Sequence, residues 1–135
     1  MNLMESRQVP EHISRLGKEH LTELLNSVSG INFVMLCTSD GFELALATKK
    51  NLENTGKIAA VRSSILAMVS AFIAEISLSG CNTITLDADN GKVVLTAVDH
   101  PQYPMAMVAS ASTDVLIGQL LFYMKKEAEL LSRIK

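Results

Sequence analysis

The side chains best suited to chemistry in this 135-residue chain are three histidines and a close pair of aspartates. His12 and His20 lie eight residues apart, about two helical turns, so a single helix would place them on the same side. A metal site needs further ligands, and no cysteine or carboxylate cluster accompanies the pair in sequence. We interpret both as surface histidines and predict no metal site.

His100 and the two aspartates near residue 88 carry no clear catalytic pattern either. His100 precedes a proline, and a general base there would need a nucleophile that the sequence does not signal, so we interpret it as a loop histidine. Asp87 and Asp89 flank a turn, but the residues that follow lack the ligand spacing of a calcium loop. The chain also lacks the G-x-x-x-x-G-K-[ST] pattern of a nucleotide-binding loop. We predict no catalytic residue and no cofactor.

The cysteines and the overall charge indicate an intracellular protein. Cys37 and Cys81 each lie in or beside a strand-like run, so we interpret them as buried, reduced thiols. A formal net charge of −2 gives no electrostatic case for binding nucleic acid or an anionic membrane. No basic run precedes an apolar start, and Arg62, Glu75 and several serines interrupt the apolar stretch 58–78, which argues against a membrane span. We expect a cytoplasmic location.

Hydrophobic periodicity predicts the order helix, two strands, helix, three strands, helix. The predicted helices run from residue 11 to about 28, from about 58 to 78, and from about 115 to 134, the last capped by Ser112-Thr113-Asp114; the strands are 31–37, 42–47, 81–88, 92–98 and 105–109. Turns at Asp40-Gly41 and Asn90-Gly91 make two hairpins, so the sheet is antiparallel.

The apolar content of the strands predicts which faces are covered. The first, fourth and fifth strands are apolar on both faces, so helices should cover both sides of the sheet. Met105 and Met107 then belong to the core. The fold class is α+β, a five-stranded antiparallel sheet between helices; residues 1–10 form a loose N-terminal arm and residues 11–135 a single domain.

The third strand should lie at an edge of that sheet. Its residues Ile84, Leu86 and Ala88 alternate with the more polar Thr83, Thr85 and Asp87. This alternation is typical of a strand with only one face fully buried, and such strands often lie at an edge.

The predicted middle helix, residues 58–78, has a bulky face and a small one. Its large apolar residues fall within an arc of roughly 160°, which suits a sheet. The small residues recur at spacings of three and four: Ala60, Ser63, Ala67, Ser70, Ala74 and Ser77. A heptad seam of such residues permits close helix contact. A solvated face without charge is the alternative. We favour pairing with the same helix of a second copy about a twofold axis, with Thr83 and Thr85 of the edge strand in the same interface.

Three stretches together resemble one known family. They are VMLCTSDGFELA, the alanine-rich IAAVRSSILAMVSAFIAEI, and TITLDADNGKVVLTAV with the STDVLIGQLL opening of the last helix. The chain resembles, over roughly residues 12–132, the roadblock family of dynein light-chain-like and bacterial GTPase-regulator proteins. The resemblance implies a five-stranded antiparallel sheet between helices and dimers joined through the middle helix and third strand. It also implies a non-catalytic platform for small Ras-like GTPases, which in some bacterial members stimulates GTP hydrolysis without donating an arginine.

The leading hypothesis is therefore a homodimeric platform that binds a Ras-like GTPase as an activator or a scaffold. The expected contacts on the middle helix are Arg62, Ser64 and Glu75, none of them catalytic. Two alternatives stay open. One is a small-ligand sensor of profilin-like or PAS-like architecture, although no strand shows a polar break for a pocket. The other is a subunit that pairs with a different roadblock chain.

Overall fold

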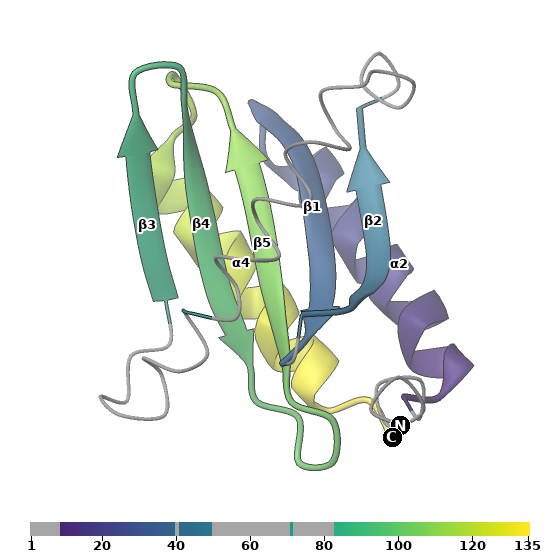
Figure 1. The fold of residues 1–135 in the computed structure, drawn as a ribbon. Helices are drawn as coiled ribbons and strands as arrows, with labels where there is room; N and C mark the ends of the chain where they lie inside the picture. The colour runs from purple at the N-terminus through teal and green to yellow at the C-terminus, as the bar shows by residue number, and fades with distance from the viewer. Residues whose placement is uncertain (1–8, 40, 50–70, 72–82) are drawn as a thin grey trace.

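The computed structural model describes residues 9–39, 41–49, 71 and 83–135. Among these residues the elements are α2 (Glu11–Ser27), β1 (Ile31–Thr38), β2 (Glu43–Thr48), β3 (Thr83–Ala88), β4 (Gly91–Val98), β5 (Met105–Ala111) and α4 (Ile117–Ser132). The strands form one sheet in the order β2-β1-β5-β4-β3, with every neighbouring pair antiparallel (Figure 1). The predicted five-stranded antiparallel sheet is confirmed. The predicted middle helix lies outside the described residues except for Ala71, which is helical.

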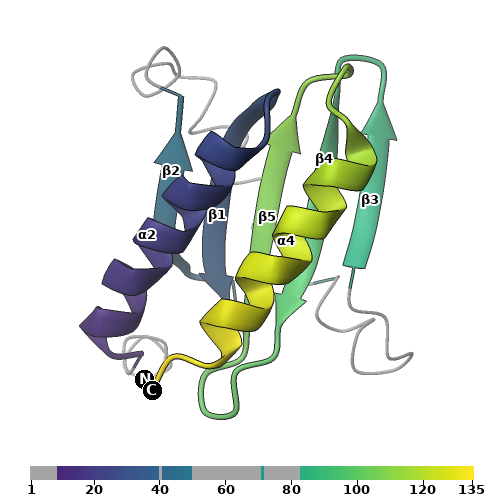
Figure 2. The same ribbon diagram turned by 180° about the vertical axis from the view of Figure 1, so that it is seen from behind.

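Both described helices pack on the same face of the sheet (Figure 2). α2 contacts β1 and β2, α4 contacts β4, and the two helices contact each other. Their apolar faces and the facing side chains of the strands form the larger core, which is made of Ile13, Leu21, Leu24, Val34, Leu36, Val94, Met105, Met107, Leu120, Met124 and Leu131 together with smaller neighbours. Met105 and Met107 are therefore core residues, as predicted.

A second core lies on the opposite face of the sheet. Its buried members are Phe33, Met35, Cys37, Leu95, Ala106 and Val108. Because successive strand residues point to opposite faces, the two cores together explain why β1 and β5 carry apolar residues on both faces. Neither described helix covers this second face, and the helix predicted for it falls outside the described residues.

The two hairpins form where the turn residues predicted them. In the first, Thr38 N–H donates to the Phe42 carbonyl at 2.8 Å and Gly41 N–H donates to the Thr38 carbonyl at 3.0 Å. In the second, Ala88 pairs with Gly91, so the two-residue loop is Asp89-Asn90 rather than Asn90-Gly91. A Cβ on Gly91 would lie 2.8 Å from the Ala111 carbonyl oxygen. Gly91 is thus needed for the close approach of β4 to the end of β5.

The residues predicted to cap the last helix do a different job. α4 begins at Ile117, and no side chain caps it. Ser112 N–H instead donates to the Gly30 carbonyl at 2.8 Å, and Ser112 Oγ donates to Asp114 Oδ1 at 2.6 Å. The latter hydrogen bond lowers the pKa of the Asp114 carboxyl. The capping prediction was wrong because these side chains hold the β5–α4 connection to the turn after α2.

Candidate protein-binding surface

β3 is the edge strand that the sequence predicted, and it is more exposed than expected. Among the described strands it pairs only with β4. Thr85, Leu86, Asp87 and Ala88 are all exposed, and Leu86 keeps 40% of its surface accessible. The prediction that one face of this strand is fully buried was wrong, because on the apolar face Ile84 is partly buried against the second core whereas Leu86 is exposed.

The backbone of β3 offers hydrogen-bonding groups to a further strand. Ala88 and Gly91 close a two-residue hairpin, so they form a hydrogen-bonded pair, and such pairs alternate along an antiparallel ladder. Thr85 and Asp87 occupy the intervening positions, where backbone N–H and C=O groups point away from β4. An edge of this kind is a template for pairing with another chain.

The acidic side chains on this hairpin are not arranged for a cation. Asp87 Oδ1 accepts a hydrogen bond from Lys92 Nζ at 2.6 Å across the β3–β4 pair. Within residues 9–39, 41–49, 71 and 83–135, no group of three or more histidine, cysteine, aspartate or glutamate side chains could hold a metal ion. The charges here belong to a cross-strand pair at the surface.

His20 is part of a polar contact between the helices. Its Nδ1 lies 2.8 Å from Glu127 Oε1, so the imidazole of α2 donates to a carboxylate of α4. Glu127 is only 1% exposed, whereas His20 is half-buried. Interpreting His20 as a plain surface histidine was wrong, because its side chain lies between α2 and α4 and contacts Glu127. His12 does not share this contact, and the two histidines form no joint site.

His100 is a buried structural residue. Its Nε2–H donates to the Ile134 carbonyl at 2.6 Å, while Nδ1 accepts from the backbone N–H groups of Gln102 and Tyr103 at 3.1 Å each. This arrangement specifies the neutral ring with its proton on Nε2. The ring ties the loop before β5 to the residues after α4. The interpretation as a plain loop histidine missed this role.

Cys37 is a buried thiol, as predicted, whereas Cys81 lies outside the described residues. Burial, with a smaller contribution from the charge of Glu43, raises the pKa of the Cys37 thiol to about 12. The thiolate is the reactive form, so this thiol should be inert at neutral pH.

We expect iodoacetamide at pH 8 to leave Cys37 unmodified in the folded chain and to label it in urea, as peptide mass spectrometry would report. Because the pKa exceeds its ordinary value of 9.0 only in the folded chain, the free energy of unfolding should fall as pH rises from 9 toward 12. Labelling of Cys37 in the folded chain at the rate of a free thiol would contradict this prediction.

The structure places only part of the predicted interface. Thr83 and Thr85 lie on the edge strand β3. The other predicted residues fall outside the described ones: Ala60, Ser63, Ala67, Ser70, Ala74 and Ser77 of the seam, and Arg62, Ser64 and Glu75 of the partner contact.

Two residues of α4 were missed although their spacing could have revealed them. Glu127 stands three residues after Met124 and four before Leu131, in the middle of the apolar face. Phe122 stands two residues from Leu120 and Met124, on the opposite, solvent-facing side. A carboxylate on the apolar face of a helix needs a hydrogen-bond donor, and an aromatic ring on its polar face suggests a contact with another molecule.

Among the described residues, no helix has the length and apolar content needed to cross a membrane.

Comparison with known proteins identifies similar sequences and folds. Residues 17–101 match the Roadblock/LC7 domain. The fold is similar to that of gliding protein MglB from Thermus thermophilus, with 15% identity, a TM-score of 0.71, and coverage of 90% of this chain and 89% of that chain. It is also similar to MglB in a tetrameric arrangement, with 16% identity, a TM-score of 0.71, and coverage of 90% of this chain and 88% of that chain. A third similar structure is MglC from Myxococcus xanthus, with 15% identity, a TM-score of 0.66, and coverage of 84% of this chain and 94% of that chain. No curated protein matches the chain.

Proposed function

Because the chain belongs to the Roadblock/LC7 family, we propose that it is a non-catalytic homodimeric platform that binds and regulates a small Ras-like GTPase. The observation that carries the proposal is the outer edge of β3, which pairs with no further strand among the described residues and where Thr85 and Asp87 direct backbone groups outward. An exposed edge strand usually needs cover, and pairing with the same strand of a second copy supplies it. The domain in this proposal is residues 11–135, and its location is cytoplasmic.

The proposed dimer combines β3 with the predicted seam of the middle helix. Two β3 strands would pair across a twofold axis, and the seam residues from Ala60 to Ser77 would bring two helices together beside them. Leu86, exposed at 40%, would lose its water in the same contact. That one of the similar structures is MglB in a tetrameric arrangement supports self-association of this chain.

The GTPase would bind the outer parts of the paired middle helices. Arg62, Ser64 and Glu75 are the proposed contacts, because they are polar residues beside the seam. Such a platform changes the nucleotide state of a GTPase by binding one switch conformation better than another. The platform needs no catalytic group of its own.

Replacing Thr85 with proline is expected to weaken the dimer about 10–100-fold while leaving the monomer folded. The N–H that proline lacks points away from β4, so the hydrogen bonds between β3 and β4 stay intact. Because the dimer is twofold symmetric, each of the two protomers loses one backbone donor at the interface. Thr85→Val, which keeps the backbone donor, is the matched control and should remain dimeric. Sedimentation velocity at low micromolar concentration, with circular dichroism to verify folding, measures the effect. A wild-type monomer would refute the dimer.

The regulatory part of the proposal needs a separate assay. We expect the wild-type chain to bind a small Ras-like GTPase encoded near its gene and to change its rate of GTP hydrolysis. Arg62→Ala and Glu75→Ala should weaken that binding without changing sedimentation. Ala67→Glu should split the dimer, because it buries a charge in the seam, and should abolish the effect on hydrolysis. If no neighbouring GTPase binds the dimeric chain, the platform role is wrong even if the dimer is right.

A further inference from the structure

The outward face of α4 exposes large apolar side chains. Phe122 is 63% exposed and Leu130 is 38% exposed, and Leu116 just before the helix is 68% exposed. α4 lies on the opposite side of the sheet from the second core (Figure 2). A cluster of exposed apolar side chains on a small domain commonly marks a contact with another molecule.

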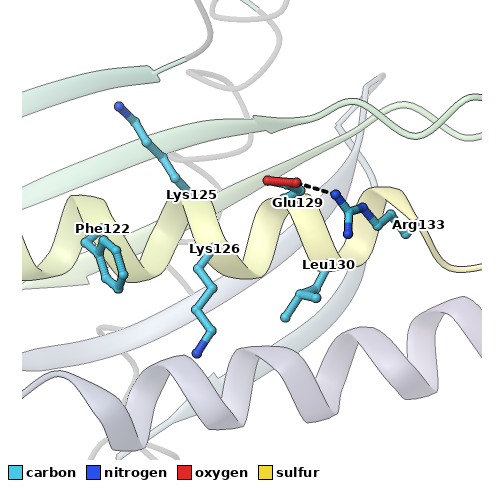
Figure 3. A pocket seen from close by; sticks show the side chains of 6 residues that line it. All are labelled: Phe122, Lys125, Lys126, Glu129, Leu130 and Arg133. Atoms are coloured by element: carbon cyan, nitrogen blue, oxygen red, sulfur yellow. Dashed lines mark hydrogen bonds and ion pairs between the residues drawn. The ribbon is translucent and has the colours of Figure 1, made fainter.

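Phe122 and Leu130 belong to a surface depression of about 450 Å³ on α4 (Figure 3). The remaining lining residues are Lys125, Lys126, Glu129 and Arg133. Phe122, Lys126 and Leu130 follow at intervals of four, so they form one line along the helix. In Figure 3 Lys126 and Leu130 point to the side on which α2 lies, whereas Lys125 points away from it. The depression thus combines an apolar line with charged side chains at its rim.

The charge of this surface is positive. It holds three cations and one carboxylate, and that carboxylate, Glu129, already accepts a hydrogen bond from Arg133. Lys126 lies 5.5 Å from the centre of the Tyr123 ring. Among the residues that the structure describes, no carboxylate lies within ion-pair distance of Lys125 or Lys126. Two cations beside an exposed aromatic ring complement an acidic partner.

Gly118 gives an independent indication that another chain approaches α4 closely. It lies in the first turn of α4, four residues before Phe122 and on the same face. A Cβ placed there would meet nothing within 4 Å, so packing inside the chain does not require glycine at this position. Glycine weakens a helix relative to alanine, and one of its uses is to let a ligand or another chain come close to the backbone.

We propose that this face of α4, formed by Gly118, Phe122, Lys125, Lys126, Leu130 and Arg133, binds an acidic amphipathic helix of another protein. From Gly118 to Leu130 the surface is about 18 Å long, which matches about three turns of a partner helix. Apolar residues of that helix would cover Phe122 and Leu130, and its carboxylates would pair with the lysines. This inference is independent of the proposed function, because none of its residues belongs to β3 or to the predicted middle helix.

An anionic membrane fits this surface less well than an acidic helix. The neighbouring helix α2 exposes Glu11, Glu19 and Glu23 together with Arg15 and Lys18, so it adds no net positive charge to attract anionic headgroups. The chain as a whole has a formal charge of −2. A single helix can follow α4 and avoid α2, whereas a flat membrane cannot.

The test uses a fluorescein-labelled 14-residue helical peptide with leucine at heptad positions a and d and glutamate elsewhere. A second peptide carries lysine in place of each glutamate. We expect fluorescence anisotropy to show binding of the acidic peptide only, weakened about tenfold or more by Phe122→Ser and by the double variant Lys125→Glu/Lys126→Glu. Phe42→Ser, at an exposed phenylalanine in the first hairpin turn, is the matched control and should bind normally. Gly118→Ala should raise the melting temperature and weaken binding of the peptide.

Several results would overturn the proposal. One is equal binding of the two peptides, or binding that both α4 variants retain. Another is binding to phosphatidylserine-containing vesicles that depends on the same residues, which would make the face a membrane contact. A third is a change in sedimentation of the free chain on Phe122→Ser, which would show that a second copy occupies the face.

Discussion

Replacing His20 with leucine should lower the free energy of unfolding by about 2–4 kcal/mol, because it leaves the buried Glu127 carboxylate without its donor. Glu127 is 1% exposed, and His20 Nδ1 at 2.8 Å is the partner described for its carboxylate. The His20 side chain keeps 27% of its surface accessible, so water can partly replace it, and the loss should not reach the value of a fully buried pair. Urea denaturation measures the change.

The double variant His20→Leu/Glu127→Leu separates loss of the pair from loss of packing. Replacing both members of a buried polar pair by apolar residues of similar volume is often neutral, so the double variant should recover most of the stability. The interaction energy from the double-mutant cycle then reports the contact between α2 and α4. Equal stability of the wild-type and His20→Leu chains would show that Glu127 does not depend on His20.

Replacing His100 with alanine should cost about 2–4 kcal/mol of unfolding free energy. The substitution removes a buried ring and leaves three backbone groups, of Gln102, Tyr103 and Ile134, without the hydrogen bonds they make in the wild type. It also releases the residues after α4, so amide hydrogen exchange should accelerate in residues 130–135.

His12→Ala is the matched control for this experiment. His12 is a half-buried histidine on α2, and the structure describes no comparable set of hydrogen bonds for it. Its replacement should change stability by less than about 0.5 kcal/mol. If His100→Ala is as mild as this control, or leaves exchange at the end of the chain unchanged, the ring does not anchor the C-terminus.

Local patterns were enough to predict the elements of the sheet and its edge strand. Apolar runs bounded by turn residues located β1, β2, β4 and β5 to within two residues, because strand formation there depends on burial of adjacent side chains. The alternation in β3 indicated an edge, since a strand with one neighbour tolerates polar side chains. Its exposure was underestimated, because the extent to which Leu86 is covered depends on tertiary packing that no strand pattern contains.

The side chains that hold the helices and loops together were harder to predict. His20 and Glu127 are 107 positions apart, so only the packing of α2 beside α4 brings them together. His100 likewise depends on where the chain runs after α4. Ser112 looked like a helix cap because its local sequence fits one, but the turn at Gly30 competes for the same groups and is preferred. In each of these three cases the contact is made with a residue far away in the sequence, which local patterns do not reveal.

The place of β5 between β1 and β4 has a consequence for how the chain folds during its synthesis. The hairpins β1–β2 and β3–β4 join neighbouring segments, and each can form as soon as its residues are available. β5 pairs with both hairpins, and its last residue is Ala111. Until that strand leaves the ribosome, one edge of β1 and one edge of β4 stay open, so the nascent chain is most exposed to mispairing just before its central strand is made.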